Sequence, residues 1–142
     1  MGVISRIISW VRERILSKTF LKFNIVGAVG VAVNMGCFWA LTEYLMIHHM
    51  VSGAVATEIS IVNNFVLNHL WTFRDRRGRM HVLVRAAAFH ISRLLGLITT
   101  LGSLFILVDI LGLPSLPSYF LSIGFGVLAN FYTSDVYVWA DR

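Results

Sequence analysis

Residues 20–46 read FLKFNIVGAVGVAVNMGCFWALTEYLM, and no charged residue lies between Lys22 and Glu43. A helix that spans a membrane needs roughly 20 mostly apolar residues, so this block is long enough to cross. The chain holds four such blocks, at 20–46, 51–73, 86–111 and 117–139. Of the 142 residues, 57% are hydrophobic and 13% are charged, against about 25% charged in a typical soluble domain. We therefore predict an all-α integral membrane protein with four transmembrane helices.

The basic residues predict the orientation of these helices. They precede the first block, fill the loop before the third block and end the chain: Arg6, Arg12, Arg14, Lys18, Lys22, Arg74, Arg76, Arg77, Arg79, Arg85 and Arg142. The loops at 47–51 and 112–117 contain neither Lys nor Arg. Because positive segments stay inside, we expect both termini and the central loop to be cytoplasmic. The net charge of +5 then indicates contact with anionic membrane lipids, and not with nucleic acid.

The N-terminal residues 3–18, VISRIISWVRERILSK, combine apolar and charged positions at helical spacing. This pattern is typical of an amphipathic helix that lies in the membrane interface. A helix packed on its own protein has the same pattern and stays an alternative. Charges interrupt the segment every few positions, so it lacks the apolar core of a cleaved signal peptide. We expect an interfacial helix at 1–19, followed by one membrane domain at 20–142.

The second half of the chain matches the first when it is shifted by 66 residues. Asn64-Phe65 aligns with Asn130-Phe131, and each pair is followed at the same spacing by two aromatic residues. These aromatic residues are Trp71, Phe73, Tyr137 and Trp139. Chance similarity between apolar helices is the alternative, but the alignment needs no gap. We predict two helical hairpins inserted in the same direction, as parallel repeats.

Polar side chains inside the apolar blocks are candidate substrate-binding residues, because polar groups in hydrocarbon are costly. Arg93 is the most informative, since it lies roughly 12 Å along the helix axis from Arg85. Its planar guanidinium suits a phosphate, although a structural ion pair or extension to the inner surface would also explain it. The predicted substrate-binding residues are Arg93, Asn64, Asn68, Asn130, Asn34, His90 and Arg85.

Several of these residues have a structural alternative. Intramembrane asparagines also join helices by hydrogen bonds, and His90 also fits a packing role. Asp135 lies near the inner end of the fourth block and is a candidate charge partner for Arg93 or for a loop arginine. We expect the polar faces of the helices to converge on an interior cavity.

The sequence has no arrangement typical of a catalytic centre. It has neither a glycine-rich phosphate loop with its lysine nor the Cys and His spacing of a metal site. The adjacent His48 and His49 do not face each other on a helix, so they make a weak metal site. We therefore expect a protein that is not an enzyme and that binds neither a cofactor nor a metal.

Three segments carry a resemblance to a known family. They are Phe20-Leu-Lys-Phe with Val26-Gly27, the segment Asn64-Phe-Val-Leu-Asn-His-Leu-Trp-Thr-Phe73, and the weaker copy from Asn130 to Trp139. Over about residues 20–140 the chain resembles the GtrA-like family of small four-helix membrane proteins. His69 stands where this family usually has Arg or Lys, and Asn34 stands where an acidic residue is common. These departures leave open the charge balance of the site and the sugar that it takes.

The resemblance implies a flippase that moves polyprenyl-phosphate-linked sugars, such as undecaprenyl-phosphate glucose. Movement would run from the inner to the outer leaflet of the bacterial inner membrane, for glycosylation of O-antigen and other envelope polysaccharides. A membrane glycosyltransferase is the implied partner, and a non-transporting anchor or scaffold for that enzyme is the alternative function. A proton-coupled drug exporter would need a carboxylate where the first helix has Asn34. Because four helices enclose little volume, we expect a homo-oligomer, with a dimer favoured.

Overall fold

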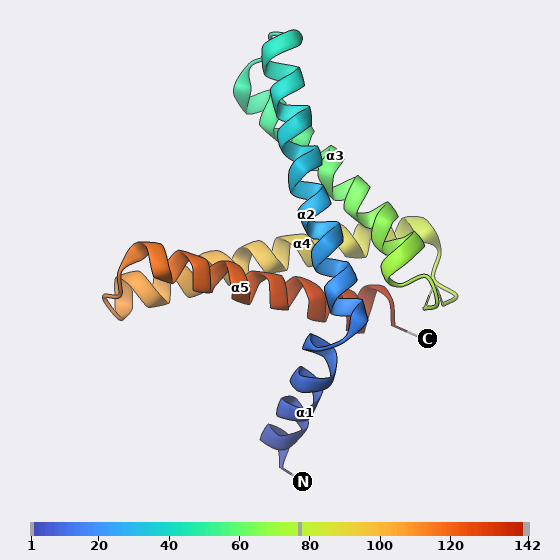
Figure 1. The fold of residues 1–142 in the computed structure, drawn as a ribbon, viewed down its shortest axis with the longest axis vertical. Helices are drawn as coiled ribbons and strands as arrows, with labels where there is room; N and C mark the ends of the chain where they lie inside the picture. Colours follow the sequence, from blue (N-terminus) through green and yellow to red (C-terminus); the bar gives the residue numbers. More distant parts are fainter. Residues whose placement is uncertain (1, 77, 141–142) are drawn as a thin grey trace. The chain divides into compact units, whose positions relative to one another are not determined.

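The computed structural model describes residues 2–76 and 78–140, and it leaves out the side chains at 3, 4, 6, 7 and 10. Arg77 and Arg142, which belong to the predicted charge pattern, lie outside the described residues. Within the described ranges the chain forms helices joined by loops, without a strand, as the predicted all-α class requires. The chain divides into two compact units, Met1–Asp75 and Arg76–Arg142 (Figure 1).

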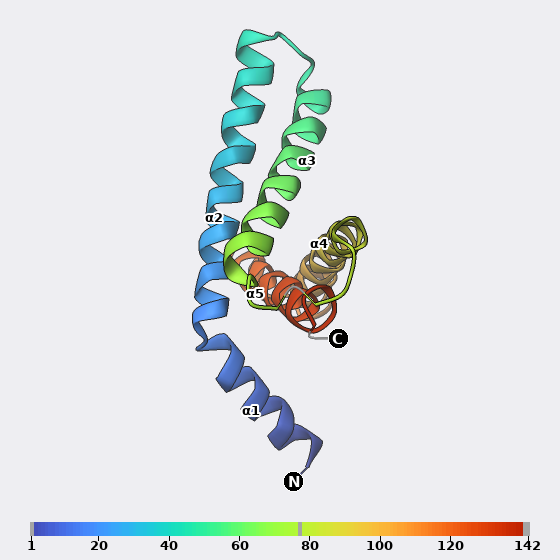
Figure 2. The same cartoon turned by 90° about the vertical axis from the view of Figure 1, so that its right-hand side faces the viewer.

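The first unit is a helical hairpin preceded by a shorter helix. α1 (Val3–Ile15) is followed by α2 (Lys18–Trp39), which continues into a π-helical turn, η1 (Ala40–Tyr44). The chain then reverses, and α3 (His49–Leu67) packs along α2 and ends in a second π-helical turn, η2 (Asn68–Thr72) (Figure 2). The predicted N-terminal helix and the first two apolar blocks therefore form separate helices.

The second unit is also a helical hairpin. α4 (Val82–Phe105) continues into the π-helical turn η3 (Ile106–Ile110), and α5 (Ser115–Thr133) packs back along α4 and ends in η4 (Ser134–Val138) (Figure 1). One sequence expectation is corrected here. Arg85 was expected in the loop ahead of the third block, but it lies in the first turn of α4 and is only 2% exposed.

Local capping explains where several helices begin. The Ser17 side chain accepts a hydrogen bond of 3.1 Å from the Phe20 N–H, which separates α1 from α2. His81 accepts a hydrogen bond of 3.3 Å from the Leu83 N–H through its Nδ1 atom. This cap starts α4 at Val82, ahead of the apolar block, and so places Arg85 on the helix. Hydropathy alone could not show that the helix extends beyond its apolar part.

Each long helix ends in one π-helical turn, in which an N–H bonds the carbonyl five residues earlier. The Phe73 N–H bonds the Asn68 oxygen at 2.8 Å, and the Trp139 N–H bonds the Ser134 oxygen at 2.9 Å. The same numbering offset of 66 that aligns the sequence halves relates η1 to η3 and η2 to η4. The two hairpins thus share their local geometry as well as their motif.

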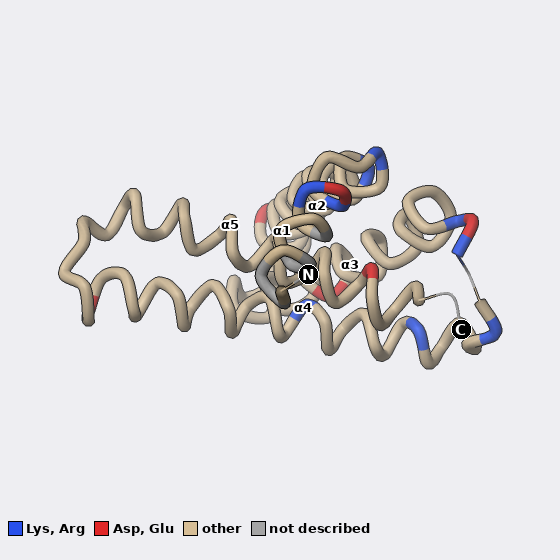
Figure 3. Tube along the Cα trace, turned by 90° about the horizontal axis from the view of Figure 1, so that it is seen from below, with Lys and Arg blue, Asp and Glu red and all other residues tan. Residues whose placement is uncertain are grey.

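Three of the described helices are long and apolar enough to cross a membrane: Lys18–Tyr44, His49–Thr72 and Val82–Ile110. These three support a multi-pass membrane protein. The fourth long helix, formed by α5 and η4, is not among them, because serines, asparagine and Asp135 lower its hydropathy. Figure 3 shows that charged residues are sparse along the α4–α5 hairpin, as expected for helices that lie in lipid.

An aromatic contact closes the same end of each hairpin. In the first unit the rings of Phe23 and Phe73 meet edge to face, with centroids 6.3 Å apart. In the second unit Phe89 and Trp139 meet in the same way at 5.4 Å. All four side chains are buried. Such aromatic pairs contribute about 0.5–1.5 kcal/mol beyond the area that they bury, so they stabilise the end of each hairpin where η2 and η4 lie.

Candidate functional site

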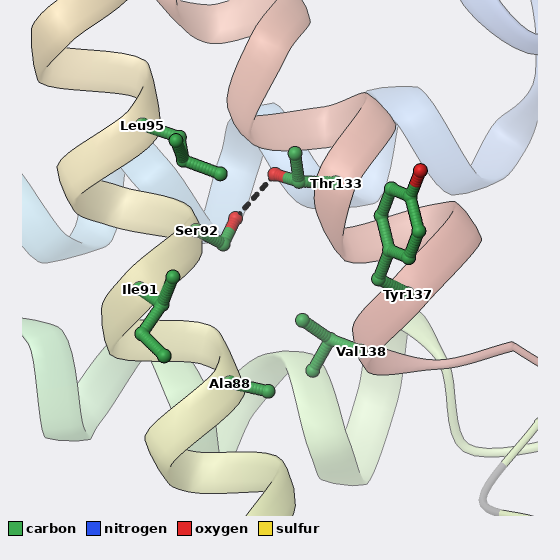
Figure 4. Close-up of a pocket in the computed structure, with 7 residues that line it drawn as sticks. All are labelled: Ala88, Ile91, Ser92, Leu95, Thr133, Tyr137 and Val138. Carbon is green, nitrogen blue, oxygen red and sulfur yellow. Dashed lines mark hydrogen bonds between the residues drawn. The ribbon is translucent and has the colours of Figure 1, made fainter.

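A groove runs between α4 and the C-terminal part of α5 in the second unit (Figure 4). It has a volume of about 300 Å³ and is partly open to its surroundings. One wall comes from α4, and the other comes from α5 and η4. The lining residues are Ala88, Ile91, Ser92, Leu95, Thr133, Tyr137 and Val138. Because α4 is apolar enough to cross a membrane, a lipid chain can reach this groove.

The two hydroxyl groups in the groove bond to the protein itself. The Ser92 and Thr133 oxygens lie 2.5 Å apart, and they face each other across the groove (Figure 4). Thr133 donates to the Ala129 carbonyl at 2.8 Å, so Ser92 is the donor in the bond to Thr133. With both hydroxyls engaged, the groove presents hydrocarbon rather than hydrogen-bonding groups.

Two arginines hold η4 at one end of this groove. The Arg85 Nε donates to the Val138 carbonyl at 3.2 Å, and both residues are buried. Arg76 forms an ion pair with the Asp135 carboxylate and also donates to the Asp135 backbone carbonyl at 3.3 Å. Asp135 is only 3% exposed, and a carboxylate so buried needs a paired cation. Among these three charged side chains one positive charge is in excess.

Arg93 and His90 lie further along α4. The guanidinium of Arg93 lies over the Phe89 ring, 4.5 Å from its centroid, which is favourable for a cation above an aromatic face. The His90 Nδ1 lies 2.9 Å from the Ala86 carbonyl, so this nitrogen carries the proton and donates. Phe89 therefore lies between Arg85 and Arg93 on one row of the helix, at four-residue spacing.

Two of the predicted asparagines contact a glycine on the facing helix. In the first unit the Asn64 side chain lies so close to Gly30 that a methyl group at Gly30 would overlap its amide. In the second unit Asn130 contacts Gly96 in the same way. Both glycines are buried, and both contacts draw the two helices of a hairpin together. This geometry favours a packing role for these two asparagines.

The other two asparagines lie in different surroundings of the first unit. Asn34 donates to the Thr57 hydroxyl at 3.3 Å, near the middle of the hairpin. The Asn68 side chain is fully buried in η2, and its amide makes no hydrogen bond to a described residue. A buried amide without a partner is costly, so Asn68 stays a candidate for contact with a bound polar group.

The predicted site residues are thus divided among several positions. Arg85 and Asp135 meet at η4, whereas Arg93 and His90 lie deeper on α4. No predicted substrate-binding residue lines the α4–α5 groove. Sequence reasoning missed the groove because its walls are ordinary apolar and small residues. The 66-residue alignment holds one signal for it: Ala88 stands where the first half has Lys22.

Residues 22–139 match the family described as GtrA/DPMS, transmembrane domain. The chain belongs to this family. The match covers both hairpins and leaves out only α1 and the chain ends. Membership places the chain among membrane proteins related to polyprenyl-phosphate sugars and to glycosyltransferases, and the GtrA domain is not itself catalytic.

One curated relative is a dolichol-phosphate mannosyltransferase from Pyrococcus furiosus. It is 39% identical over 94 residues, which cover 66% of this chain and 25% of the relative. The matched part of this GtrA/DPMS chain thus corresponds to about a quarter of the length of the mannosyltransferase.

Proposed function

We propose that this GtrA/DPMS chain is a flippase for a polyprenyl-phosphate-linked sugar, such as undecaprenyl-phosphate glucose. The observation that carries the proposal is the row Arg85, Phe89 and Arg93 on one membrane-crossing helix. The two arginines are separated by eight residues, or roughly 12 Å of helix. Intramembrane arginines are costly and mark paths for charged groups. A phosphate held first at Arg85 would next be held at Arg93.

The sugar needs hydrogen-bonding groups while it passes through hydrocarbon. Asn68 supports this role, because its buried amide makes no hydrogen bond to a described residue. Asn34, Asn64, Asn130 and His90 are the further residues that we assign to the path, although Asn64 and Asn130 also pack the hairpins. The prenyl chain stays in lipid during the movement, so only the head group needs this protection.

We propose that α5 with η4 crosses the membrane as the fourth span, and that the hairpins are parallel repeats. The shared aromatic contacts and the offset of 66 residues between the π-helical turns support this arrangement. Both termini and the central loop then lie in the cytoplasm of a bacterial cell. In this arrangement α1, within residues 1–19, lies in the inner interface, and the membrane domain occupies 20–142. Reporter fusions at each loop would test the orientation.

The proposed partners follow from the chemistry of the substrate. A membrane glycosyltransferase must supply the lipid-linked sugar on the inner side, and anionic lipids meet the basic segments there. A homo-oligomer, with a dimer favoured, would enlarge the path that four helices enclose. No cofactor and no nucleic acid takes part in the proposal.

The direct test is transbilayer movement of a labelled undecaprenyl-phosphate sugar in liposomes that contain the purified protein. We expect movement with the wild type and its loss with Arg93→Ala. Arg79→Ala removes the same charge from an exposed loop position and is the matched control. Equal folding of both variants is checked by circular dichroism. No movement with the wild type across several sugars would refute the flippase for the isolated chain.

The second candidate function is a membrane anchor for a glycosyltransferase. The favouring observation is that a relative four times longer than the matched region is named a mannosyltransferase. The two functions respond differently to mutation. Reversing the charges in the loop between α3 and α4 would abolish an anchoring function, whereas Arg93→Ala would leave it intact. Co-purification of the glycosyltransferase with each variant distinguishes the two outcomes.

A further inference from the structure

The two hairpins differ at the position of the groove. In the first unit the residue 66 positions before Ala88 is Lys22, and the residue before Tyr137 by the same offset is Trp71. The Lys22 ammonium lies over the Trp71 ring, 5.3 Å from its centroid. This contact covers the place that corresponds to the groove. In the second unit Ala88 has only a methyl group, and the groove stays open.

The polar residues of the groove follow the same division. Ser92 and Thr133 stand where the first unit has Val26 and Leu67, so the closed hairpin has bulkier apolar side chains there. The two hydroxyls of the open groove bond to each other and to backbone carbonyls. An occupant therefore gains no hydrogen bonds from the walls. A water molecule would need two to four polar partners, so hydrocarbon suits the groove better.

One end of the groove is basic. Val138 lines the groove, and its carbonyl accepts a hydrogen bond from Arg85 at 3.2 Å. The guanidinium keeps its positive charge at any accessible pH and binds phosphate well. A molecule that fits both parts must have an anionic group followed directly by an apolar chain. The volume of about 300 Å³ is roughly ten times the 30 Å³ of a water molecule, enough for about two isoprene units.

We propose that the α4–α5 groove binds the first isoprene units of a polyprenyl phosphate, with the phosphate at Arg85. The second hairpin alone provides this site, because Lys22 closes its counterpart in the first. The inference rests on the proposed function in the choice of lipid, but it concerns binding and does not require movement. It identifies Ala88 and Lys22 as the residues that decide which hairpin takes the chain.

The test is photolabelling with an undecaprenyl phosphate that carries a diazirine on its first isoprene unit. The full-length protein is labelled in liposomes, and the attachment sites are mapped by mass spectrometry. Label on peptides from α4 and η4 is expected, and excess undecaprenyl phosphate should compete while phosphatidylglycerol should not. Equal competition by phosphatidylglycerol would overturn the proposal, because the groove would then be a general lipid site.

Two substitutions at neighbouring positions separate filling of the groove from a general effect. Ala88→Phe places a ring in the groove, and labelling should fall by about tenfold because the chain is excluded. Ala87→Phe adds the same ring at an exposed position of α4 and should leave labelling within about twofold. If Ala88→Phe labelled like Ala87→Phe, the site would be elsewhere.

A third substitution tests the closed hairpin by a gain of labelling. Lys22→Ala removes the side chain that covers Trp71, and new label is expected on peptides from α2 and η2. Misfolding would not produce specific label that unlabelled lipid competes away. If labelling stays intact while liposomes show no lipid movement, the flippase fails and the groove stands. Movement without label at the groove would overturn the groove and leave the flippase.

Discussion

Replacement of Gly96 by alanine should expose how closely the helices of the second hairpin approach each other. A methyl group at this position would overlap the carbonyl oxygen, carbon and nitrogen of the Asn130 side-chain amide. Overpacking of this kind costs about 1–3 kcal/mol. Gly102 lies on the same helix, and a methyl group there would meet no atom within 4 Å. Gly102→Ala is therefore the matched control.

The comparison of the two alanine variants isolates the overlap. Both replacements remove a glycine from a helix interior, which stabilises a helix by up to about 1 kcal/mol. Because this gain is common to both, Gly96→Ala should be less stable than Gly102→Ala by about 2 kcal/mol. Unfolding in mixed micelles with rising SDS, followed by circular dichroism, measures the difference.

A double mutant identifies the neighbour that causes the loss. Asn130→Ala removes the overlapping amide, so the double variant Gly96→Ala/Asn130→Ala should recover most of the stability. The coupling energy between the two sites should be about 1–2 kcal/mol. Stability of Gly96→Ala equal to that of Gly102→Ala, or a coupling within about 0.5 kcal/mol of zero, would refute the close approach.

Three further predictions follow from the contacts of the two hairpins. Asp135→Asn leaves the Arg76 charge without its carboxylate and should destabilise the protein by about 1–3 kcal/mol in the same SDS assay; no loss would mean that the ion pair contributes little. Ser60→Ala removes the 2.7 Å hydrogen bond from the Ser60 hydroxyl to the Gly30 carbonyl and should cost about 0.6 kcal/mol, as for other interhelical bonds in membranes; a cost above about 2 kcal/mol would contradict this. Arg85→Ala should weaken binding of undecaprenyl phosphate by about tenfold and leave binding of neutral undecaprenol unchanged, as titration calorimetry in micelles would show, whereas equal losses for both lipids would assign Arg85 a purely structural role.

The candidate site was only partly accessible to sequence reasoning. The polar residues were found because charged and amide groups stand out in apolar blocks. Asp135 was left with two potential partners, and the structure pairs it with Arg76, which lies 59 residues away in the chain. The groove was not found, since an apolar lining in an apolar helix gives no local signal. Its walls come from α4, α5 and η4, and only their packing creates the space.

The sequence by itself determined the helical class, the length of the membrane spans and the match between the two halves. These properties depend on hydropathy and spacing, which act over a few helical turns. Tertiary structure decided which small residues meet which polar ones, as at Gly96 and Asn130. It also decided that Lys22 covers one hairpin while Ala88 leaves the other open. Such contacts join residues about 30–50 positions apart, so they form only after the helices have packed.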